Sequence, residues 1–222
     1  MDLINYFGRN AEKFLHDDQP SPHGLLGWTK KLTTAYRPYP LVGVITPWNF
    51  PLAMAGLDVP PALVAGAAVL LKPSEVTPLS ALELARGWAE IGAPEVFAIA
   101  TGRGETGAAV VDAVDYVQFT GSTRTGQAVA RQCVDQLKPY SLELGGKDPA
   151  LVLADADINR AVHGIAWGGL MNAARSACRS SASTSRRRST TSSSRSSPSA
   201  SVNCVKARTA RTSASISDRW RT

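Results

Sequence analysis

The chain has 222 residues, and its net charge of +6 is distributed unevenly along the sequence. Residues 174–222 contain ten Arg, one Lys and one Asp, so this segment carries +10 and residues 1–173 carry a net charge of −4. The body therefore lacks the basic composition of a nucleic-acid-binding domain, no apolar run reaches the roughly 18 residues of a membrane helix, and the N-terminus shows no secretory signal pattern.

The first part of the chain predicts one amphipathic helix and then two buried strands. Ile4–Leu15 repeats its apolar residues at helical spacing, and packing against a core is the simplest role for such a helix. A Pro- and Gly-rich stretch follows up to residue 40. Leu41–Thr46 and Ala67–Lys72 are short apolar runs typical of buried strands, and the residues between them predict a helix bracketed by prolines.

The same alternation continues to about residue 134. Thr77 and Pro78 predict an N-cap and a first helical residue. Glu95–Gly102 and Val114–Gly121 predict further strands, and each is followed by a helical segment. Strands that alternate with helices need crossover connections, so we expect an α/β fold with an open, largely parallel sheet covered on both faces. Such sheets bind ligands at the carboxyl ends of their strands, where the distinctive loops of this sequence fall.

Three of these loops have residues suited to a nucleotide. GRGETG (102–107) fits the spacing G-x-G-x-x-G, although glycines at a turn more often serve backbone geometry alone. FTGSTRTG (119–126) joins a strand end to a helix start, where backbone N–H groups suit a pyrophosphate. LKPSE places Lys72 and Glu75 just after a strand, and the carboxylate can accept both hydroxyls of a ribose. A solvated turn is the simpler explanation for that loop taken alone.

Two further loops have residues suited to catalysis. TPWNFP (46–51) is a rigid turn between prolines, and it can aim the amide N–H of Asn49 at an oxyanion. LELGGK (142–147) places Glu143 between two leucines and before two glycines, which makes it a candidate general base. A surface glutamate at a strand end is the competing interpretation of that motif.

The motifs VGVITPWNFPL, LKPSEVTPLSAL, VQFTGSTRTG and LELGGK, in this order, resemble the NAD(P)-dependent aldehyde dehydrogenase superfamily over about residues 4–173. The combination is closest in character to succinate-semialdehyde dehydrogenases. The resemblance implies that Asn49 forms the oxyanion hole and that Glu143 activates the deacylating water. It implies cofactor contacts from a larger set of residues at the strand ends: Ile45, Thr46, Pro47, Trp48, Lys72, Ser74, Glu75, Gly102, Phe119, Thr120, Gly121, Ser122, Gly126 and Leu144.

The resemblance also implies a domain organisation and a reaction. Residues 1–145 would form a partial Rossmann-like NAD(P)-binding domain, and residues 146–173 would begin the catalytic domain. The reaction would oxidise an aldehyde to a carboxylic acid through a thiohemiacetal. Glu75 favours NAD, because a carboxylate would repel the 2′-phosphate of NADP, and NADP is the alternative. No metal is expected. Members of the family are normally homo-oligomeric, and we expect this chain to lack the N-terminal portion, the oligomerisation segments and most of the catalytic domain.

The nucleophilic cysteine that this chemistry needs is not where the resemblance implies. It should follow Glu143 by 34 residues, and position 177 is Ala177, one residue before Cys178. One added base before the Arg175 codon, with suitable GC-rich codons, gives Gln-Val-Cys-Val-Ser-Val-Glu-Arg-Val-Tyr-Val, with the cysteine at position 177. The sequence therefore predicts a frameshift after about residue 173, which would leave the chain inactive.

Residues 174–222 would then be an out-of-frame, disordered Ser/Arg-rich tail, since they have few large apolar side chains and a high net charge. The alternative is a nucleotide-binding remnant whose basic tail binds polyanions, without a specific nucleic-acid partner. Three cysteines, Cys133, Cys178 and Cys204, predict no disulfide framework. We therefore expect a cytoplasmic protein that binds no membrane, and the resemblance implies a small aldehyde as its substrate.

Overall fold

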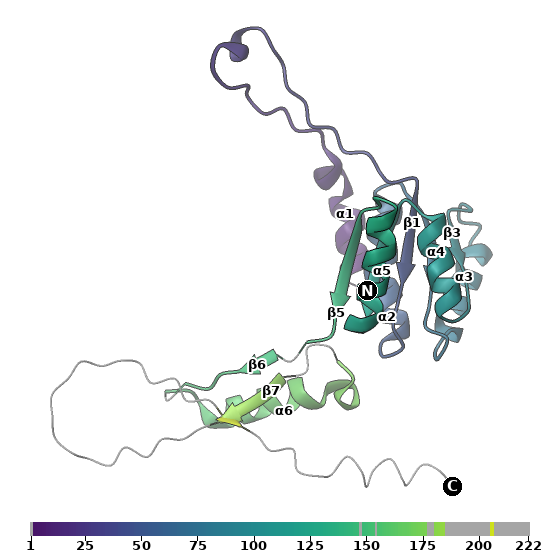
Figure 1. Ribbon diagram of the computed structural model, residues 1–222. Coiled ribbons are helices and arrows are strands. Elements are labelled where there is room, and N and C mark those ends of the chain that lie inside the picture. The colour runs from purple at the N-terminus through teal and green to yellow at the C-terminus, as the bar shows by residue number, and fades with distance from the viewer. Residues whose placement is uncertain (1, 147, 154, 177–179, 185–204, 207–222) are drawn as a thin grey trace, which may run out of the picture. The chain divides into compact units, whose positions relative to one another are not determined.

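The computed structural model describes residues 2–146, 148–153, 155–176, 180–184 and 205–206 (Figure 1). The chain divides into two compact units, Met1–Leu144 and Gly145–Thr222. The first unit contains every residue that the sequence predicts to contact a cofactor, as well as Asn49 and Glu143. Position 177, which the sequence predicts for the nucleophile, belongs to the second unit and lies outside the described residues.

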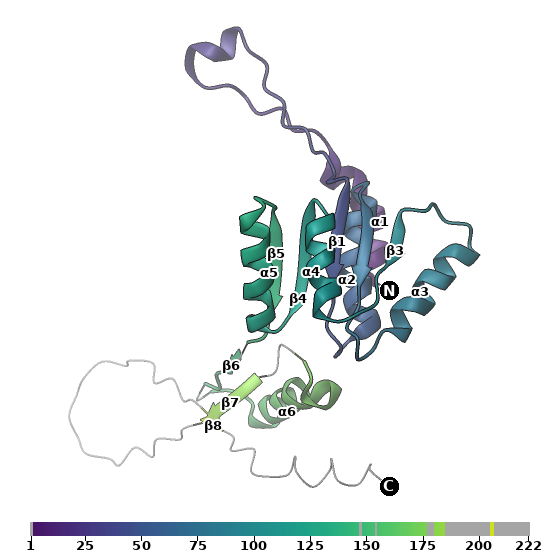
Figure 2. The same cartoon turned by 45° about the vertical axis from the view of Figure 1, so that its right-hand side comes forward.

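The first unit is built on a five-stranded parallel sheet, seen obliquely in Figure 2. The strand order is β3-β2-β1-β4-β5, and every neighbouring pair runs parallel. The chain builds outward from β1 through β2 to β3, and then returns to place β4 on the other side of β1. The expected open α/β sheet is confirmed. Its strands are β1 (Leu41–Ile45), β2 (Ala68–Lys72), β3 (Phe97–Ile99), β4 (Tyr116–Gly121) and β5 (Tyr140–Leu144).

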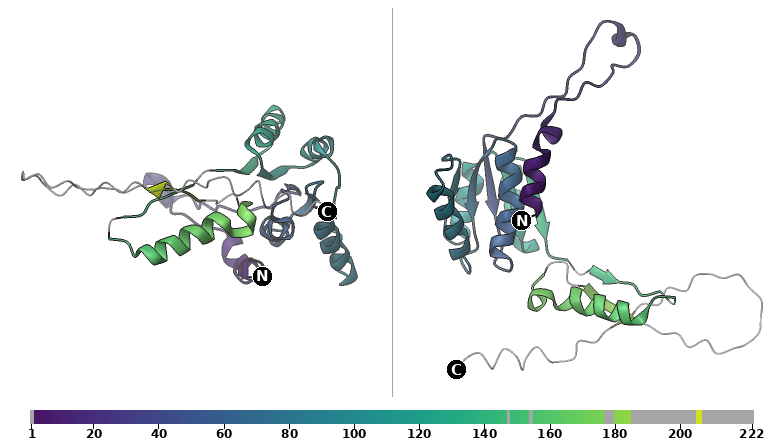
Figure 3. Two further views of the ribbon diagram at one scale, coloured as in Figure 1. Left: turned by 90° about the horizontal axis from the view of Figure 1, so that it is seen from below. Right: turned by 180° about the vertical axis from the view of Figure 1, so that it is seen from behind.

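Helices cover both faces of the sheet, as the end-on view in Figure 3 shows. The crossover helices α2 (Pro51–Val64) and α3 (Leu79–Glu90) lie on one face, and α4 (Gly104–Ala113) and α5 (Thr123–Asp135) on the other. Strand side chains alternate between the two faces. Val42 and Val44 therefore join the core beneath α2, whereas Ile45 joins the core beneath α4 and α5.

A glycine in β1 allows α4 to pack closely on the sheet. A Cβ atom at Gly43 would lie 2.9 Å from Val114 Cγ2 and 3.0 Å from Val110 Cγ1. Both valines are buried in the core of that face. The missing side chain at Gly43 is therefore a packing requirement of the α4 crossover, which is the connection that carries the chain from β3 across to β4.

The N-terminal helix α1 (Asp2–Leu15) packs against α2 and confirms the amphipathic helix expected from the sequence. Between α1 and β1 the chain runs out and back as an extended arm, at the top of Figure 1. The arm is joined by an antiparallel bridge between Asp18 and Thr34, and it contains the short 3₁₀ helix η1 (Gly24–Trp28). The side chain of Trp28 is almost fully exposed.

The predicted start of α3 is wrong by one residue. The helix begins at Leu79 with Pro78 as its N-cap residue, and no side chain caps it. The hydroxyl of Thr77 instead donates a hydrogen bond to the carbonyl oxygen of Trp48 at 3.4 Å. Thr77 therefore ties the segment before α3 to the loop after β1, an interaction across 29 residues that local capping rules do not anticipate.

The second unit contains helix α6 and three short strands. The order of its sheet is β6-β7-β8, in which β6 and β7 are parallel and β7 and β8 antiparallel. The side chain of Asp157 caps α6 by accepting from the backbone N–H of Arg160 at 3.1 Å. Most of the predicted disordered tail lies outside the described residues. The bounds are β6 (Asp148–Ala150), α6 (Ile158–Ala174), β7 (Ser180–Thr184) and β8 (Val205–Lys206).

Candidate functional site

The residues predicted to contact a cofactor are gathered at one edge of the sheet. In the strand register Ile45 lies beside both Lys72 and Phe119, at the carboxyl ends of β1, β2 and β4. Farther along the sheet, Thr120 pairs with Glu143 and Gly121 pairs with Leu144. β1 and β4 are neighbours, but the chain leaves β1 toward β2 and leaves β4 toward β5, in opposite directions along the sheet. This edge is therefore the switch point of the topology. The topology therefore puts the predicted residues where open α/β sheets bind ligands.

The loop after β1 is held in place from two sides. Thr46 is buried, and its backbone N–H donates to the carbonyl oxygen of Lys72 at 3.1 Å, which continues the sheet ladder beyond Ile45. Trp48 receives the hydrogen bond from Thr77, yet 47% of its side chain remains exposed. The loop therefore presents an aromatic surface to solvent on a backbone fixed at both ends.

Lys72 is the one charged residue whose side chain is deeply buried among those described at this edge. Its ammonium donates to the carbonyl oxygen of Pro73 at 2.9 Å and lies 3.8 Å from the carboxylate of Glu75. Burial lowers the pKa of Lys72, and the nearby negative charge of Glu75 opposes that shift. Ser74 shapes the same turn, since its hydroxyl accepts from the N–H of Val76 at 3.3 Å. Glu75 itself is exposed and faces solvent.

The glycine-rich loop after β3 leads directly into α4. Gly102 adopts a φ of +152°, and a Cβ atom there would collide with the hydroxyl oxygen of Thr106. Gly107 lies in the first turn of α4, where a Cβ atom would meet the aliphatic part of Lys72 at 3.6 Å. Gly102 is therefore required by the strand-to-helix turn, in agreement with the simpler explanation of the GRGETG motif, whereas a Cβ atom at Gly107 would make only an ordinary contact.

The start of α5 is capped and tightly packed. Ser122 is the N-cap residue, and its hydroxyl accepts from the backbone N–H of Thr125 at 3.2 Å. Gly126 is buried, and a Cβ atom there would lie 2.6 Å from Leu144 Cδ2 and 3.4 Å from Phe119. Phe119 is only 3% exposed. Phe119 and Leu144 therefore support this helix start from behind, and the backbone of Gly121 and Ser122 forms the outer surface.

The two predicted catalytic residues lie at the same edge of the sheet. Asn49 stands in the turn between β1 and α2, and its side-chain amide oxygen is buried. Glu143 is exposed and lies near the end of β5. Its neighbours Leu142 and Leu144 pack on the α5 side of the sheet, so the Glu143 side chain points to the opposite face. Ala177 and Cys178 are both outside the described residues.

Asp58 is a residue with unusual chemistry that the motifs did not identify. It lies in α2, and burial together with the negative charge of Glu143 raises its pKa from 3.8 to about 6. A lone carboxylate in the apolar helix PLAMAGLDVPPALV was the available signal in the sequence. Among the described residues no group of His, Cys, Asp and Glu could hold a metal ion.

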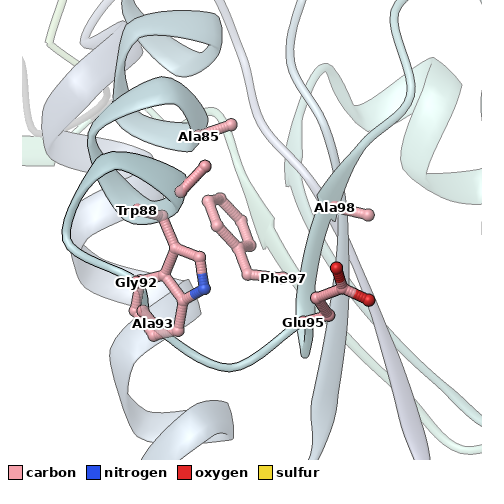
Figure 4. A pocket seen from close by; sticks show the side chains of 8 residues that line it. Ala85, Trp88, Gly92, Ala93, Glu95, Phe97 and Ala98 are labelled. Atoms are coloured by element: carbon pink, nitrogen blue, oxygen red, sulfur yellow. The ribbon is translucent and has the colours of Figure 1, made fainter.

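The pocket shown in Figure 4 lies elsewhere on this unit. It has a volume of about 510 Å³ and lies between α3 and β3, with Trp88, Glu95 and Phe97 among its lining residues. The indole N–H of Trp88 donates to the carbonyl oxygen of Pro94 at 2.7 Å. None of the predicted site residues lines it, so this pocket is separate from the carboxyl edge.

The sequence and the fold both match known proteins. The model of the "Aldehyde dehydrogenase family" matches residues 1–184. The chain is 44% identical over 169 residues to aminoaldehyde dehydrogenase 1, peroxisomal, from Malus domestica, which covers 74% of this chain and 33% of that relative. It is 42% identical over 156 residues to a Mycolicibacterium smegmatis protein named as a succinate-semialdehyde dehydrogenase [NADP(+)], which covers 69% of this chain and 30% of the relative.

Solved structures agree with this relationship. An aldehyde dehydrogenase from Bacillus cereus, determined as an NAD⁺ complex, superposes with a TM-score of 0.74 at 36% identity, covering 79% of this chain and 36% of that one. An aldehyde dehydrogenase from Brucella melitensis biovar abortus 2308 superposes with a TM-score of 0.72 at 35% identity, covering 79% of this chain and 36% of that one.

The chain spans about a third of the length of the curated relatives it matches. No helix in the described part of the chain is both long and apolar enough to cross a membrane. The chain belongs to the aldehyde dehydrogenase family.

Proposed function

We propose that the protein from which this chain derives oxidises an aldehyde to a carboxylic acid with NAD(P). The observation that carries the proposal is the convergence, at one edge of the sheet, of the Asn49 turn, the Lys72–Glu75 loop and Glu143, which follow or end β1, β2 and β5. Asn49 would donate its amide N–H to the oxygen of the bound aldehyde as charge develops there. Glu143 would take the proton from the water that hydrolyses the thioester.

The residues at this edge fit a dinucleotide. Helix α5 begins just after β4, and α4 begins after the short glycine-rich loop that follows β3. The N-termini of both helices have backbone N–H groups that suit phosphate. Trp48 offers a half-exposed aromatic surface on a rigid loop. Glu75 is exposed beside Lys72 at the end of β2, where its carboxylate can accept the hydroxyls of a ribose. When bound, the cofactor supplies a nicotinamide ring that accepts hydride from the substrate carbon.

We infer that NAD is preferred over NADP. The exposed carboxylate of Glu75 would repel a 2′-phosphate, while Lys72 is largely occupied by Pro73 and Glu75. The test compares kcat/KM for the two nucleotides in a frame-corrected, full-length protein and in its Glu75→Gln variant. We expect at least a tenfold preference for NAD, about 1.4 kcal/mol, which the variant reduces. A tenfold preference for NADP in the unmodified protein would contradict the assignment.

We also propose that the printed chain does not oxidise aldehydes. Position 177 carries a methyl group where the thiolate is required, and loss of a nucleophile can cost on the order of 10⁶ in rate. If the neighbouring Cys178 lies in an extended segment, its side chain points to the opposite face from position 177. The experiment follows NADH production by residues 1–222 with succinate semialdehyde, an aminoaldehyde and betaine aldehyde. The same assay is run on the frame-corrected protein, whose gene has one base restored before the Arg175 codon.

The outcomes separate the remaining alternatives. Turnover by the frame-corrected protein alone would support both the reaction and the frameshift, and the aldehyde used fastest would define the substrate, for which we favour succinate semialdehyde. Turnover by the printed chain that disappears on Cys178→Ala would refute the frameshift and the loss of the nucleophile together. Salt-sensitive polyanion binding by the printed chain, with an intact reading frame in several isolates, would favour the remnant with a basic tail. The domain roles of residues 1–145, 146–173 and 174–222, cytoplasmic localisation and homo-oligomerisation of the whole protein stay predictions.

A further inference from the structure

One carboxyl group in the first unit lies next to the candidate site and has no role in the chemistry described above. Asp58 occupies the middle of α2, between the buried residues Ala55 and Val59. Its Oδ2 atom is buried and has no hydrogen-bond partner, and its Oδ1 atom is 3.5 Å from the side-chain amide nitrogen of Gln118 in β4. A carboxylate that is desolvated and receives only one long hydrogen bond is poorly stabilised as an anion.

The alternation of β4 and β5 brings Glu143 to the same face of the sheet as Asp58. Val117 and Phe119 point toward α4 and α5, so Gln118 and Thr120 point toward α2. Thr120 pairs with Glu143 in the parallel register, and Leu142 and Leu144 point to the α5 side. Gln118, Thr120 and Glu143 therefore form a polar strip on the α2 face, which Asp58 joins through Gln118.

The same carboxyl group reaches a pocket on this face. The pocket has a volume of about 460 Å³ and is lined by Asp58 and Gln118 together with residues of the arm and of α1. Its titratable lining groups are Tyr36, Arg37, Tyr39, Tyr116 and Asp58, and α1 contributes Leu15. Arg37 donates to the backbone oxygen of Tyr36 at 3.5 Å. Asp58 is thus accessible to proton exchange from the side of the sheet that faces away from α4 and α5.

We propose that Asp58 is a second acid–base carboxyl of the candidate site, coupled electrostatically to Glu143 across β4 and β5, and that it exchanges its proton with solvent through this pocket. Asp58 acts through Glu143 and not on the substrate, so it is a positioning residue. When Asp58 releases its proton, a negative charge appears on the same face of the sheet as Glu143, and repulsion between the two carboxylates disfavours that release. The functional part of this proposal rests on the proposed function, whereas the coupling itself does not.

The coupling is tested by following the carboxyl carbons of residues 1–222 by NMR between about pH 3 and pH 9, a range that spans the ordinary and raised values of a carboxyl group. We expect Asp58 to titrate with a midpoint near 6, in line with its raised pKa. Glu143→Gln should lower that midpoint toward the ordinary aspartate value without reaching it, because burial of Asp58 remains. Glu75→Gln is the matched control: it removes an exposed carboxylate at the same sheet edge and should leave the Asp58 midpoint unchanged. A midpoint near the ordinary value, or one that Glu143→Gln does not move, overturns the proposal.

The consequence for catalysis is tested in the frame-corrected, full-length protein. We expect the pH profile of kcat to contain a step with a midpoint near 6 that Asp58→Asn removes. If Asp58→Asn does not fold, Gln118→Leu serves instead, since it removes the hydrogen bond to Asp58 Oδ1 and should move the step to higher pH. A step that persists unchanged in both variants overturns the role of Asp58. Absence of any turnover, together with an Asp58 midpoint that Glu143→Gln lowers in the printed chain, would reject the proposed function and leave the coupling standing.

Discussion

Asp58→Asn should stabilise the first unit at neutral pH and leave its stability almost unchanged in acid. The substitution keeps an oxygen at the Oδ1 position for Gln118 and removes the negative charge that is buried in the folded protein. The pKa of Asp58 is raised from 3.8 to about 6, and at 1.36 kcal/mol per pH unit this corresponds to about 3 kcal/mol. Asp58 is only partly buried, so solvent screening should reduce the measured effect to about 1–2 kcal/mol.

The sign of the pH dependence follows from linkage. Because the pKa of Asp58 is higher in the folded than in the unfolded chain, folding binds a proton between pH 3.8 and about 6. The stability from this group is therefore fully present below pH 3.8 and is lost as the pH rises through about 6. Asparagine has no charge to lose, so the difference between the variant and the unmodified chain should appear over this window and stay constant above it.

The assay is denaturant unfolding of residues 1–222 and of the Asp58→Asn variant at several pH values from about 4 to 8, which bracket the transition of Asp58, followed by circular dichroism. Asp135→Asn is the matched control, since Asp135 is an exposed aspartate at the end of α5 in the same unit. A gain that is the same at both ends of this range would show that the substitution acts through packing and not through charge. Destabilisation at the alkaline end would show that the Asp58 carboxylate has a partner that offsets its burial, and the reasoning would be refuted.

Three further predictions concern the packing and capping of the same unit. Gly43→Ala should destabilise the unit by about 1–3 kcal/mol in denaturant unfolding, because the new methyl group would press on two buried valines. The control is Gly87→Ala in α3, where the new methyl group would have no neighbour within 4 Å. This variant should be slightly more stable than the unmodified chain or equally stable. Ser122→Ala should cost about 1 kcal/mol through loss of the cap on α5, and a thermal melt that matches the unmodified chain would contradict this. The pKa of Asp112 is lowered by hydrogen bonds from Gln132 and Gln136, so its contribution is present above pH 3.8 and lost as the pH falls further. Asp112→Asn should therefore lower the free energy of unfolding at neutral pH more than in strong acid, as measured by denaturant unfolding. An equal loss of stability in both conditions would refute the role of these hydrogen bonds.

Much of the fold could be predicted from local patterns. The alternation of apolar runs with helical segments indicated a parallel sheet, since side-chain periodicity depends on residues close together in sequence. Polar and glycine-rich loops at strand ends placed the candidate site at the carboxyl edge, and the register of Ile45 with Lys72 and Phe119 agrees with that placement. The roles of Asn49 and Glu143 rest on the resemblance of their motifs, and they stay predictions.

Other features depended on contacts between distant parts of the chain, which local patterns do not contain. The chain returns from β3 to place β4 beside β1 through the α4 crossover, which packs closely on Gly43. Thr77 forms no helix cap, because Trp48, 29 residues earlier, offers a carbonyl oxygen. Asp58 meets Gln118 across 60 residues of sequence. Sequence thus determined which residues follow each strand, whereas tertiary structure decided their neighbours, because burial and electrostatic coupling arise only when separate elements pack together.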